Sequence, residues 1–525
     1  MNELTIDAIQ RKLAAGELTA RGLVEYYLAR IEAIDRAGPR LNAVIEVNPD
    51  ARDIADALDE KARWLRTDRP KQAGLCRLHG VPVLLKANID TADRMITDAG
   101  SLALAGSIAA RDAILVERLR AAGAIILGKT NLSEWANFRG KRPVSGWSSR
   151  GGLTRNPYAL DRSGCGSSTG SAVAVAAGLC TVAVGTETDG SITCPASVNG
   201  VVGIKPTVGL ISQAGIIPIA HSQDTAGPLA RTVADAAILL SVLAGQPVNS
   251  GQSAVNSGGG ELSKSAIADD SGLLTVHRPL VTDYTPYLDK NGLRGARIGV
   301  ARQYFGQHPR VDALAEVSLE AMRRAGAALV DLAEPLPDEE LSVYERTVLL
   351  YEFKADLNAY LAGLGPDAPV KSLAEVIAFN EANRARVMPY FGQERMLDAQ
   401  EKGPLTEEAY LTALATARRL AREEGIDRAL AGQTLDAIVA PTVGPAWPFD
   451  LVSGDCYEGV SCTSPAAVAG YPHVTVPAGD ILGLPVGLSF FAGAWSEGAL
   501  IRLAYAFEQA TLARVAPQFP PTIPV

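Results

Sequence analysis

Cysteine and histidine are both scarce in this chain of 525 residues. The six cysteines form no C-x-x-C pair, which argues against a disulfide-built scaffold or a zinc ribbon, and several lie among small or apolar residues, as buried free thiols do. The five histidines show no metal-ligand spacing and no H-E-x-x-H motif. The cysteines are Cys76, Cys165, Cys180, Cys194, Cys456 and Cys462, and the histidines are His79, His221, His277, His308 and His473. We therefore expect no metal site.

An excess of basic charge and a long apolar run are missing as well. The formal net charge is −9, so neither a nucleic acid nor an anionic membrane surface is expected as the main partner. The first residues lack the basic stretch and apolar run of a secretory signal. The most apolar stretch, residues 172–184, is too short and too interrupted to span a bilayer. We expect a cytoplasmic protein, although a leader removed from the mature chain is left open.

From residue 80 onward, short apolar runs alternate with stretches of helical periodicity. This alternation is typical of an α/β fold in which helices cover a buried sheet. The expected strands cover residues 81–85, 124–127, 296–300, 328–332, 435–439, 474–477 and 486–491. Residues 338–432 are strongly helical and charged, and we interpret them as an insertion between strands. The sequence thus predicts one mixed sheet with helices on both faces.

We expect a single domain, 1–525, because the late strands resemble the early ones and no internal repeat is present. Within it, N-terminal helices occupy residues 1–70 and the core lies at 75–245. Residues 246–272 are rich in Ser, Gly, Asn and Asp, which is typical of a flexible loop. The segment 273–525 then holds the helical insertion and completes the sheet.

Two patterns suggest other enzyme classes. Residues 258–265 imitate a phosphate-binding P-loop, but the glycine that should precede Lys264 is missing, so we discard this interpretation. Residues 166–170 match the G-x-S-x-G elbow of α/β-hydrolases, with Ser168 as the nucleophile and His473 as the late histidine that the elbow needs. An ordinary Gly/Ser turn opening a helix explains this pattern at least as well, and the elbow remains an alternative.

One lysine closes an apolar strand. Lys86 directly follows residues 81–85, and a lysine in this position is expected to be desolvated. Desolvation lowers the pKa of an amine from about 10.4 toward neutrality, which makes it a general base. The ordinary alternative is a lysine that reaches solvent, because lysines are rarely fully buried.

Two segments rich in glycine and serine follow. Residues 164–171 allow close approach of the backbone and lead into the alanine-rich run 172–177, which is expected to pack as a tight buried helix. Residues 185–195 place Gly190 directly before Ser191 in a tight turn. Such a turn presents consecutive backbone N–H groups, the donors of an oxyanion hole. Each segment alone also fits ordinary turn chemistry.

Together, the lysine and the two segments resemble the amidase signature family. The hallmarks are the Gly/Ser segment, the later Asp189-Gly190-Ser191-Ile192 turn and the upstream lysine. Further matching segments lie at residues 200–207, 224–232 and 483–488. The resemblance implies a hydrolase that cuts a carboxamide C–N bond through an acyl-enzyme intermediate and needs no cofactor.

The resemblance also assigns roles to individual residues. Ser191 is the nucleophile, Ser167 is a bridging serine that follows a cis peptide bond, and Lys86 is the terminal base. The oxyanion hole is formed by the backbone N–H groups of Thr188, Asp189, Gly190 and Ser191.

Two departures from the family pattern stand out. Most members have Gly-Gly-Ser-Ile-Arg, whereas Asp189 and Thr193 occupy the first and last of these positions here, and Ala87 replaces a common acid after the lysine. Asp189 therefore places a carboxylate beside the active turn. The same departure resembles members that release ammonia from C-terminally amidated peptides, and so do residues 131–140, 222–228 and 350–354. Terminal peptide amides are therefore the expected substrates.

Other activities stay open beside this one. They are hydrolysis of fatty-acid or aryl amides, the role of a glutamine amidotransferase A-type subunit, and a scaffold without activity, which the joint presence of Lys86, Ser167 and Ser191 disfavours. For the substrate pocket we expect the aromatic residues Trp135, Phe138, Tyr471 and Trp447, whose alternative role is core packing. The expected partner is a small-molecule or peptide amide, with no nucleic acid and no membrane, and a monomer is the simplest expectation for the oligomeric state.

Overall fold

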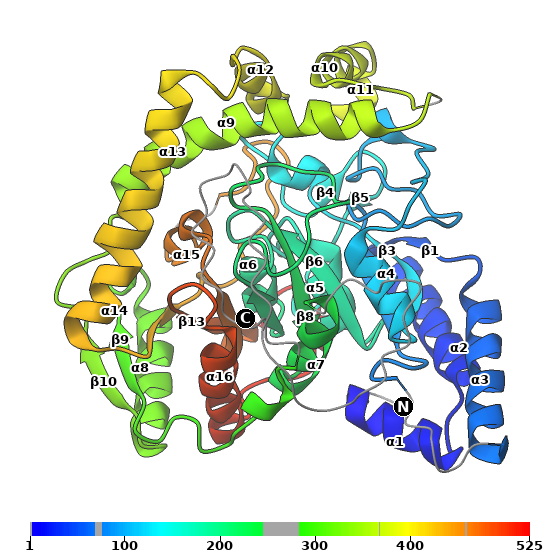
Figure 1. The fold of residues 1–525 in the computed structure, drawn as a ribbon, viewed down its shortest axis with the longest axis horizontal. Helices are drawn as coiled ribbons and strands as arrows, with labels where there is room; N and C mark the ends of the chain where they lie inside the picture. Colours follow the sequence, from blue (N-terminus) through cyan, green and yellow to red (C-terminus); the bar gives the residue numbers. More distant parts are fainter. Residues whose placement is uncertain (1–2, 69–75, 245–282, 367, 457–458, 525) are drawn as a thin grey trace, which may run out of the picture.

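The structure is a computed structural model that describes residues 3–68, 76–244, 283–366, 368–456 and 459–524 (Figure 1). The loop expected at residues 246–272 lies outside these ranges, and the division of the chain into segments remains a prediction. Among the described helices, none combines the length and the apolar character needed to cross a membrane.

In the described part of the chain, an 11-stranded mixed sheet forms the centre of the molecule, in the order β1-β3-β2-β6-β8-β7-β12-β13-β11-β9-β10. Its strands are β1 (Val44–Val47), β2 (Pro82–Lys86), β3 (Ile125–Thr130), β6 (Val182–Glu187), β7 (Val202–Lys205), β8 (Thr225–Ala230), β9 (Arg297–Val300), β10 (Ala328–Asp331), β11 (Ala437–Pro441), β12 (His473–Ile481) and β13 (Leu484–Phe491). Strands β4 (Trp147–Ser148) and β5 (Gly152–Leu153) form a separate hairpin. Strand β2 is parallel to β3 and β6, and β9 is parallel to β10 and β11, while antiparallel pairs join these two groups.

The α-helices are α1 (Ile6–Ala15), α2 (Ala20–Arg30), α3 (Ala51–Asp68), α4 (Ile114–Ala121), α5 (Thr169–Ala176), α6 (Thr193–Val198), α7 (Val233–Leu243), α8 (Pro309–Arg324), α9 (Asp338–Gly363), α10 (Leu373–Ala382), α11 (Arg384–Val387), α12 (Glu394–Gln400), α13 (Glu408–Ala421), α14 (Asp427–Gln433), α15 (Ser464–Ala469) and α16 (Glu497–Thr511). Shorter helical turns are η1 (Ile31–Arg36), η2 (Leu102–Leu104), η3 (Glu134–Asn137), η4 (Thr285–Tyr287), η5 (Arg302–Tyr304) and η6 (Arg422–Ile426). The segment from α9 to α14 joins β10 to β11, and α9 crosses one end of the molecule with α10, α11 and α12 on its outer side (Figure 1).

Helices cover both faces of the sheet, as the sequence predicts. Phe490 of β13 packs against Phe507 of α16 with ring centroids 5.8 Å apart. Gly487 of the same strand lies against Ser197 of α6. Because side chains three residues apart on a strand point to opposite faces, α16 and α6 lie on opposite sides of the sheet. The predicted α/β class with a mixed sheet is therefore confirmed.

Strand β2 explains where the polar groups gather. Each of its residues is buried, as expected for a parallel strand covered on both faces. Since β2 and β6 are parallel, their carboxyl ends meet at one edge of the sheet. Lys86 ends β2, Glu187 ends β6, and the turn that holds Ser191 follows directly. The topology thus brings Lys86 and Ser191 to the same edge.

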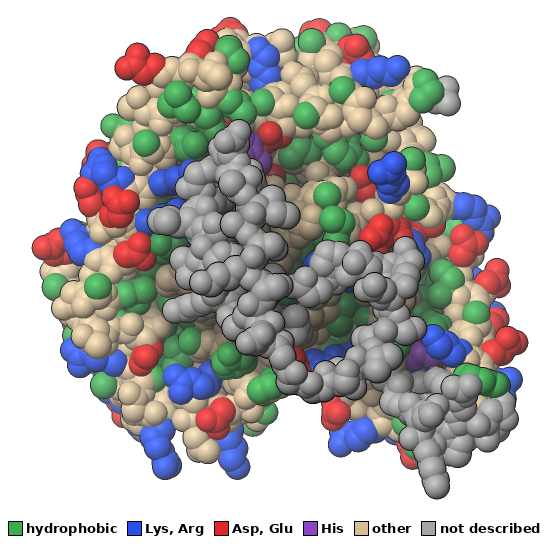
Figure 2. Space-filling model, viewed as in Figure 1, with side chains coloured by type: hydrophobic (Ala, Val, Ile, Leu, Met, Phe, Trp, Pro, Cys, Tyr) green, Lys and Arg blue, Asp and Glu red, His purple; other side chains and the backbone are tan. Residues whose placement is uncertain are grey.

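Charges of both signs are mixed over the surface. On the face shown in Figure 2, acidic and basic side chains alternate, and neither sign gathers into an extended patch. The described residues visible on this face therefore form no basic stripe of the kind that is typical of nucleic-acid-binding proteins.

Candidate active site

Lys86 is fully buried at the end of β2. Its Nζ atom lies 2.7 Å from Ser167 Oγ, 2.8 Å from Thr186 Oγ1 and 3.1 Å from the carbonyl oxygen of Thr186. Burial lowers the pKa of Lys86 to about 7, although Asp224 and Glu187 act in the opposite direction. A neutral amine is thus available near neutral pH, with its lone pair free to accept the hydroxyl proton of Ser167.

Ser167 follows a cis peptide bond from Gly166, in the position that the family resemblance implies. The backbone is closely packed here, because a Cβ atom on Gly166 would lie 2.2 Å from Ser133 Oγ. The N–H group of Ser133 also donates to the carbonyl oxygen of Ser167 (3.1 Å). A larger residue at position 166 would force the Ser133 side chain to move, and the Ser133 N–H group holds the loop that presents Ser167 to Lys86.

Ser191 lies in a tight turn with unpaired donors. Gly190 has a φ of 73°, a conformation that glycine adopts without strain. Within the described ranges, the N–H groups of Asp189, Gly190 and Ser191 and the hydroxyl of Ser191 make no hydrogen bond to the protein. Catalytic hydrogen bonds are often absent until substrate is bound. The turn therefore offers a free hydroxyl beside several free N–H donors, the arrangement that an oxyanion hole requires.

Two buried carboxylates hold this turn in place. Glu187 Oε2 accepts the N–H groups of Ile192 (2.7 Å) and Thr193 (2.9 Å), and Thr193 also donates its hydroxyl to Glu187 (3.2 Å). Asp224 Oδ1 accepts the hydroxyl of Thr188 (2.5 Å). Burial raises the pKa of both carboxyls, that of Asp224 to about 6. Thr193, which replaces the arginine common in the family, thus anchors the turn through Glu187.

A cavity of about 530 Å³ opens beside Ser191. Its lining combines the Ser191 turn and Phe138 with residues of α9 and α12, among them Glu345, Arg346, Leu349, Leu350 and Arg395. Phe138 is thus the member of the predicted aromatic set that lines the cavity. Sequence reasoning did not anticipate the α9 and α12 residues, because their charged helical pattern carries no signal of a pocket.

The other three aromatic side chains of the expected set do not line this cavity, and their role in substrate binding stays a prediction. Trp135 is 2% exposed and belongs to an apolar cluster. The Tyr471 hydroxyl donates to Asp427 (2.9 Å), and Trp447 Nε1 donates to Asp455 (3.0 Å). Aromatic side chains fill cores as readily as pockets, and their burial here follows from contacts between distant segments.

The structure gives Ser168 a structural role. Its hydroxyl donates to the carbonyl oxygen of Thr186 (2.9 Å) and accepts the N–H group of the same residue (3.1 Å), and the side chain is fully buried. His473 is also fully buried and is hydrogen-bonded to Ser489 (2.5 Å). The elbow alternative therefore lacks a nucleophile that a substrate can reach.

A disulfide joins Cys165 to Cys194, although the small and apolar residues around several cysteines favoured buried free thiols. The bond links the residue before Gly166 to helix α6, directly after the Ser191 turn. Cys180 and Cys462 are buried free thiols, as expected. The pairing depends on two segments meeting in space, so spacing along the chain did not reveal it.

Replacing both Cys165 and Cys194 with alanine is expected to lower the free energy of unfolding by about 3 kcal/mol, because the cross-link no longer restricts the unfolded chain. Urea unfolding under non-reducing conditions measures the change. Cys456→Ser, at an exposed free thiol, serves as the control. Equal stability of the double variant and the control would show that the disulfide contributes nothing.

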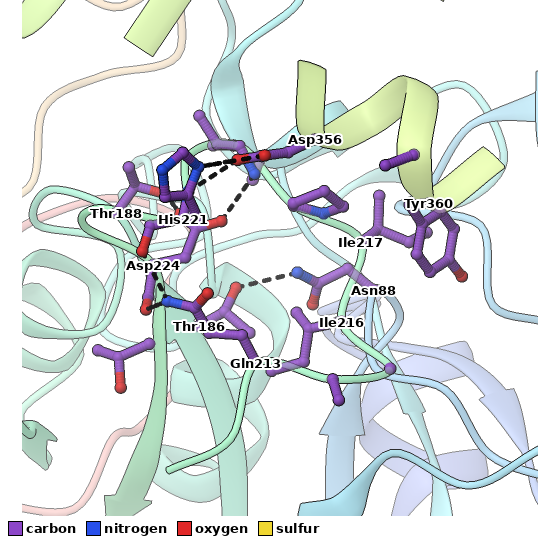
Figure 3. Close-up of a pocket in the computed structure, with 17 residues that line it drawn as sticks. Asn88, Thr186, Thr188, Gln213, Ile216, Ile217, His221, Asp224, Asp356 and Tyr360 are labelled. Carbon is purple, nitrogen blue, oxygen red and sulfur yellow. Dashed lines mark hydrogen bonds and ion pairs between the residues drawn. The ribbon is translucent and has the colours of Figure 1, made fainter. Parts of the chain in front are cut away.

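A second cavity, of about 340 Å³, shares Thr188 with the first (Figure 3). Asn88 lines it and donates to Thr186 Oγ1 (3.0 Å), the same oxygen that Lys86 contacts. Within the described ranges, potential ligand atoms of three residues lie within 4.8 Å of one another, namely His221, Glu352 and Asp356. A metal ion fits this geometry, but the ion pair of His221 and Asp356 (2.9 Å), which raises the pKa of His221, also accounts for it.

Comparison with known proteins agrees with this geometry. The family model described as Amidase matches residues 22–501. The crystal structure of native peptide amidase from Stenotrophomonas maltophilia has a TM-score of 0.87 and 50% sequence identity, and the match covers 99% of each chain. A probable amidase of Arabidopsis thaliana is 41% identical (99% of this chain, 92% of the relative), and the A-type subunit of a glutamyl-tRNA(Gln) amidotransferase from Chloroflexus aurantiacus is 35% identical (97% of each). The chain therefore belongs to the amidase signature family of amide-hydrolysing enzymes.

Proposed function

We propose that this enzyme removes the terminal carboxamide group of peptides, with Ser191 as nucleophile, Ser167 as proton relay and Lys86 as base. The observation that carries the proposal is the 2.7 Å contact between Lys86 Nζ and Ser167 Oγ in a fully buried pair, at the same sheet edge as Ser191. The 50% identity to a peptide amidase supports the choice of substrate.

The reaction follows from these positions. Ser191 Oγ attacks the carboxamide carbon while its proton passes to Ser167, whose own proton passes to neutral Lys86. The N–H groups of the Ser191 turn bind the oxyanion of the tetrahedral intermediate. The relay then returns a proton to the nitrogen, the C–N bond breaks, and ammonia leaves. Water hydrolyses the acyl-enzyme by the same relay.

The cavity beside Ser191 accommodates the rest of the substrate. Its volume of about 530 Å³ is in the range of small-molecule sites, about 300–1,000 Å³. Phe138, Leu349 and Leu350 supply apolar surface for a peptide tail, while Glu345 and Arg395 supply charge. The carboxamide occupies the end at Ser191.

Ammonia release from a blocked dipeptide amide tests the proposal, with a fatty amide, an aryl amide and glutamine beside it. Glutamine is included because of the similarity to an amidotransferase component. We expect release from the peptide amide and a loss of at least about 10⁴-fold in Ser191→Ala, because the nucleophile is removed. A fluorophosphonate probe should label the wild type and not this variant.

Each other outcome contradicts one part of the proposal. Release only from the fatty or aryl amide, or only from glutamine, would keep the catalytic residues and overturn the peptide substrate. Undiminished release by Ser191→Ala would place the nucleophile elsewhere. Ser168→Ala should remain labelled by the probe. Thermal unfolding of this variant shows whether the two hydrogen bonds from Ser168 to Thr186 are needed for folding.

Cellular location and partners are proposed from the sequence: a cytoplasmic monomer that binds neither nucleic acid nor membrane. The disulfide of Cys165 and Cys194 bears on the location, because disulfides persist mainly in oxidising compartments. Cell fractionation combined with thiol labelling tests this. An oxidised pair in an extracytoplasmic fraction would overturn the cytoplasmic location.

A further inference from the structure

Asp189, the carboxylate that departs from the family pattern, meets a second carboxyl group. Glu345 of α9 reaches the active turn from a distant part of the chain, and its carboxyl group lies beside that of Asp189. Both residues line the cavity beside Ser191. The hydroxyl of Ser464 donates to Asp189 Oδ2 (2.6 Å), Thr463 is a second hydroxyl beside this carboxyl, and the buried Oδ1 atom has no donor at full hydrogen-bond geometry among the described residues. A protonated Glu345 would offer one more donor to this carboxyl group.

The same glutamate is tied to the turn at a second point. Gln223 Nε2 donates to Glu345 Oε1 (2.9 Å) and to the carbonyl oxygen of Thr188 (3.3 Å). Glu345 thus contacts the turn directly at Asp189 and, through Gln223, at Thr188. Figure 3 shows Thr188 and Asp224 close together in the second cavity, where the Thr188 hydroxyl donates to Asp224. The turn that carries the free N–H groups is therefore held at Thr188 by Asp224 and, through Gln223, by Glu345 of α9.

Two carboxyl groups in contact in a buried site cannot both be ionised, so one proton is shared between them. Burial and the neighbouring Asp189 raise the pKa of Glu345 to about 8, and burial also raises that of Asp189. The charged and titratable groups around the pair are Lys205, Glu187, Arg346, Arg395, Asp338, Tyr304 and Cys462. The cations among them are Lys205 near Asp189 and the two arginines near Glu345. They favour one negative charge on the pair, which leaves the one shared proton in place at neutral pH.

We propose that Glu345 is a positioning residue which, in its protonated form, donates a hydrogen bond to Asp189 and thereby holds the turn whose N–H groups bind the oxyanion. The inference rests on the proposed function of Ser191 and extends it to the helical segment between β10 and β11. When the shared proton is lost, two like charges face each other and the turn moves away from the geometry that the oxyanion needs.

The consequence is a pH profile with two limbs of different origin. Turnover rises as Lys86 loses its proton, with a pKa of about 7. Turnover falls again as the pair of Glu345 and Asp189 loses its proton near pH 8. The alkaline limb thus reports the titration of Glu345 and Asp189, whereas the acid limb reports the titration of Lys86.

The test compares Glu345→Gln and Glu345→Ala with wild type from about pH 6 to about pH 10, by ammonia release and by the rate of fluorophosphonate labelling of Ser191. Glutamine keeps a hydrogen-bond donor for Asp189 and cannot ionise. We expect Glu345→Ala to lower kcat by about 10- to 100-fold at pH 7, in line with loss of oxyanion stabilisation, and Glu345→Gln to restore most of it. In Glu345→Gln the alkaline limb should be absent and the acid limb unchanged. Glu340→Gln, at an exposed position of the same helix, is the control.

The alternative outcomes are distinct. An unchanged alkaline limb in Glu345→Gln would overturn the inference, as would a change confined to KM, which would mean that Glu345 only contacts substrate. If Glu345→Ala fails to fold, the alkaline limb of the Glu345→Gln pH profile still tests the inference. Labelling that disappears in Ser191→Ala upholds the proposed nucleophile whatever the Glu345 variants show, so the two proposals fail separately.

Discussion

Replacing Lys86 with methionine is expected to lower kcat by about 10³- to 10⁴-fold with little change in KM, because the variant keeps the length of the side chain and loses the base. The buried amine is the only proton acceptor in direct contact with Ser167 among the described residues. Without it, the Ser167 hydroxyl has no group to which it can pass the proton taken from Ser191. Steady-state ammonia release from a peptide amide measures the loss.

The pH dependence of the wild type gives a second readout of the same residue. Because the pKa of Lys86 is lowered to about 7, the amine is protonated and inactive below this pH and neutral above it. Turnover should therefore rise with pH through about 7, and the small residual activity of Lys86→Met should lack this rise. A rise that survives in the variant would assign the acid limb to another group.

Lys129 offers a matched control for this substitution. It is fully buried on the neighbouring strand β3, and burial lowers its pKa to about 8. Its Nζ atom contacts the carbonyl oxygen of Ile89 and the hydroxyl of Thr97, not Ser167. Lys129→Met should therefore retain turnover per folded molecule. Equal losses in both variants would mean that removal of any buried lysine disturbs this edge of the sheet.

Glu134→Ala is expected to lower the free energy of unfolding by about 3–5 kcal/mol, the usual cost of leaving one member of a buried ion pair alone. Glu134 and Arg139 are both fully buried, with 2.9 Å between Oε1 and Nη1. Arg139 also donates to the carbonyl oxygens of Val387, Phe391 and Gly392, so it ties the helical segment to the core. The substitution leaves a buried guanidinium without its countercharge. Urea unfolding monitored by circular dichroism measures the effect.

A surface pair of the same chemistry provides the comparison. Glu381 and Arg384 also lie 2.9 Å apart, but their side chains are 61% and 63% exposed. Glu381→Ala should change stability by less than about 1 kcal/mol, because solvent screens the pair. If Glu134→Ala were no more costly than Glu381→Ala, burial of the pair would not be the source of its contribution.

Much of the fold and of the site was accessible from local sequence. Strands β2 and β13 were predicted because apolar periodicity is a local property, and the mixed sheet follows from the alternation of such runs. Lys86, Ser167 and Ser191 stood out because glycine and small residues around them are needed wherever the backbone turns tightly. The strands found at Pro82–Lys86 and Leu484–Phe491 agree with the expected ranges within a few residues.

Motif and composition alone thus identified the family, the sheet with its helical segment, and the residues proposed to carry out catalysis. Tertiary packing decided which side chains surround them. It brought Glu345 to Asp189, paired Cys165 with Cys194, and placed Tyr471 and Trp447 away from the cavity. The physical reason is that a turn or a strand is encoded by neighbours in sequence. A pocket wall, a disulfide or a shared proton depends instead on which distant segments meet.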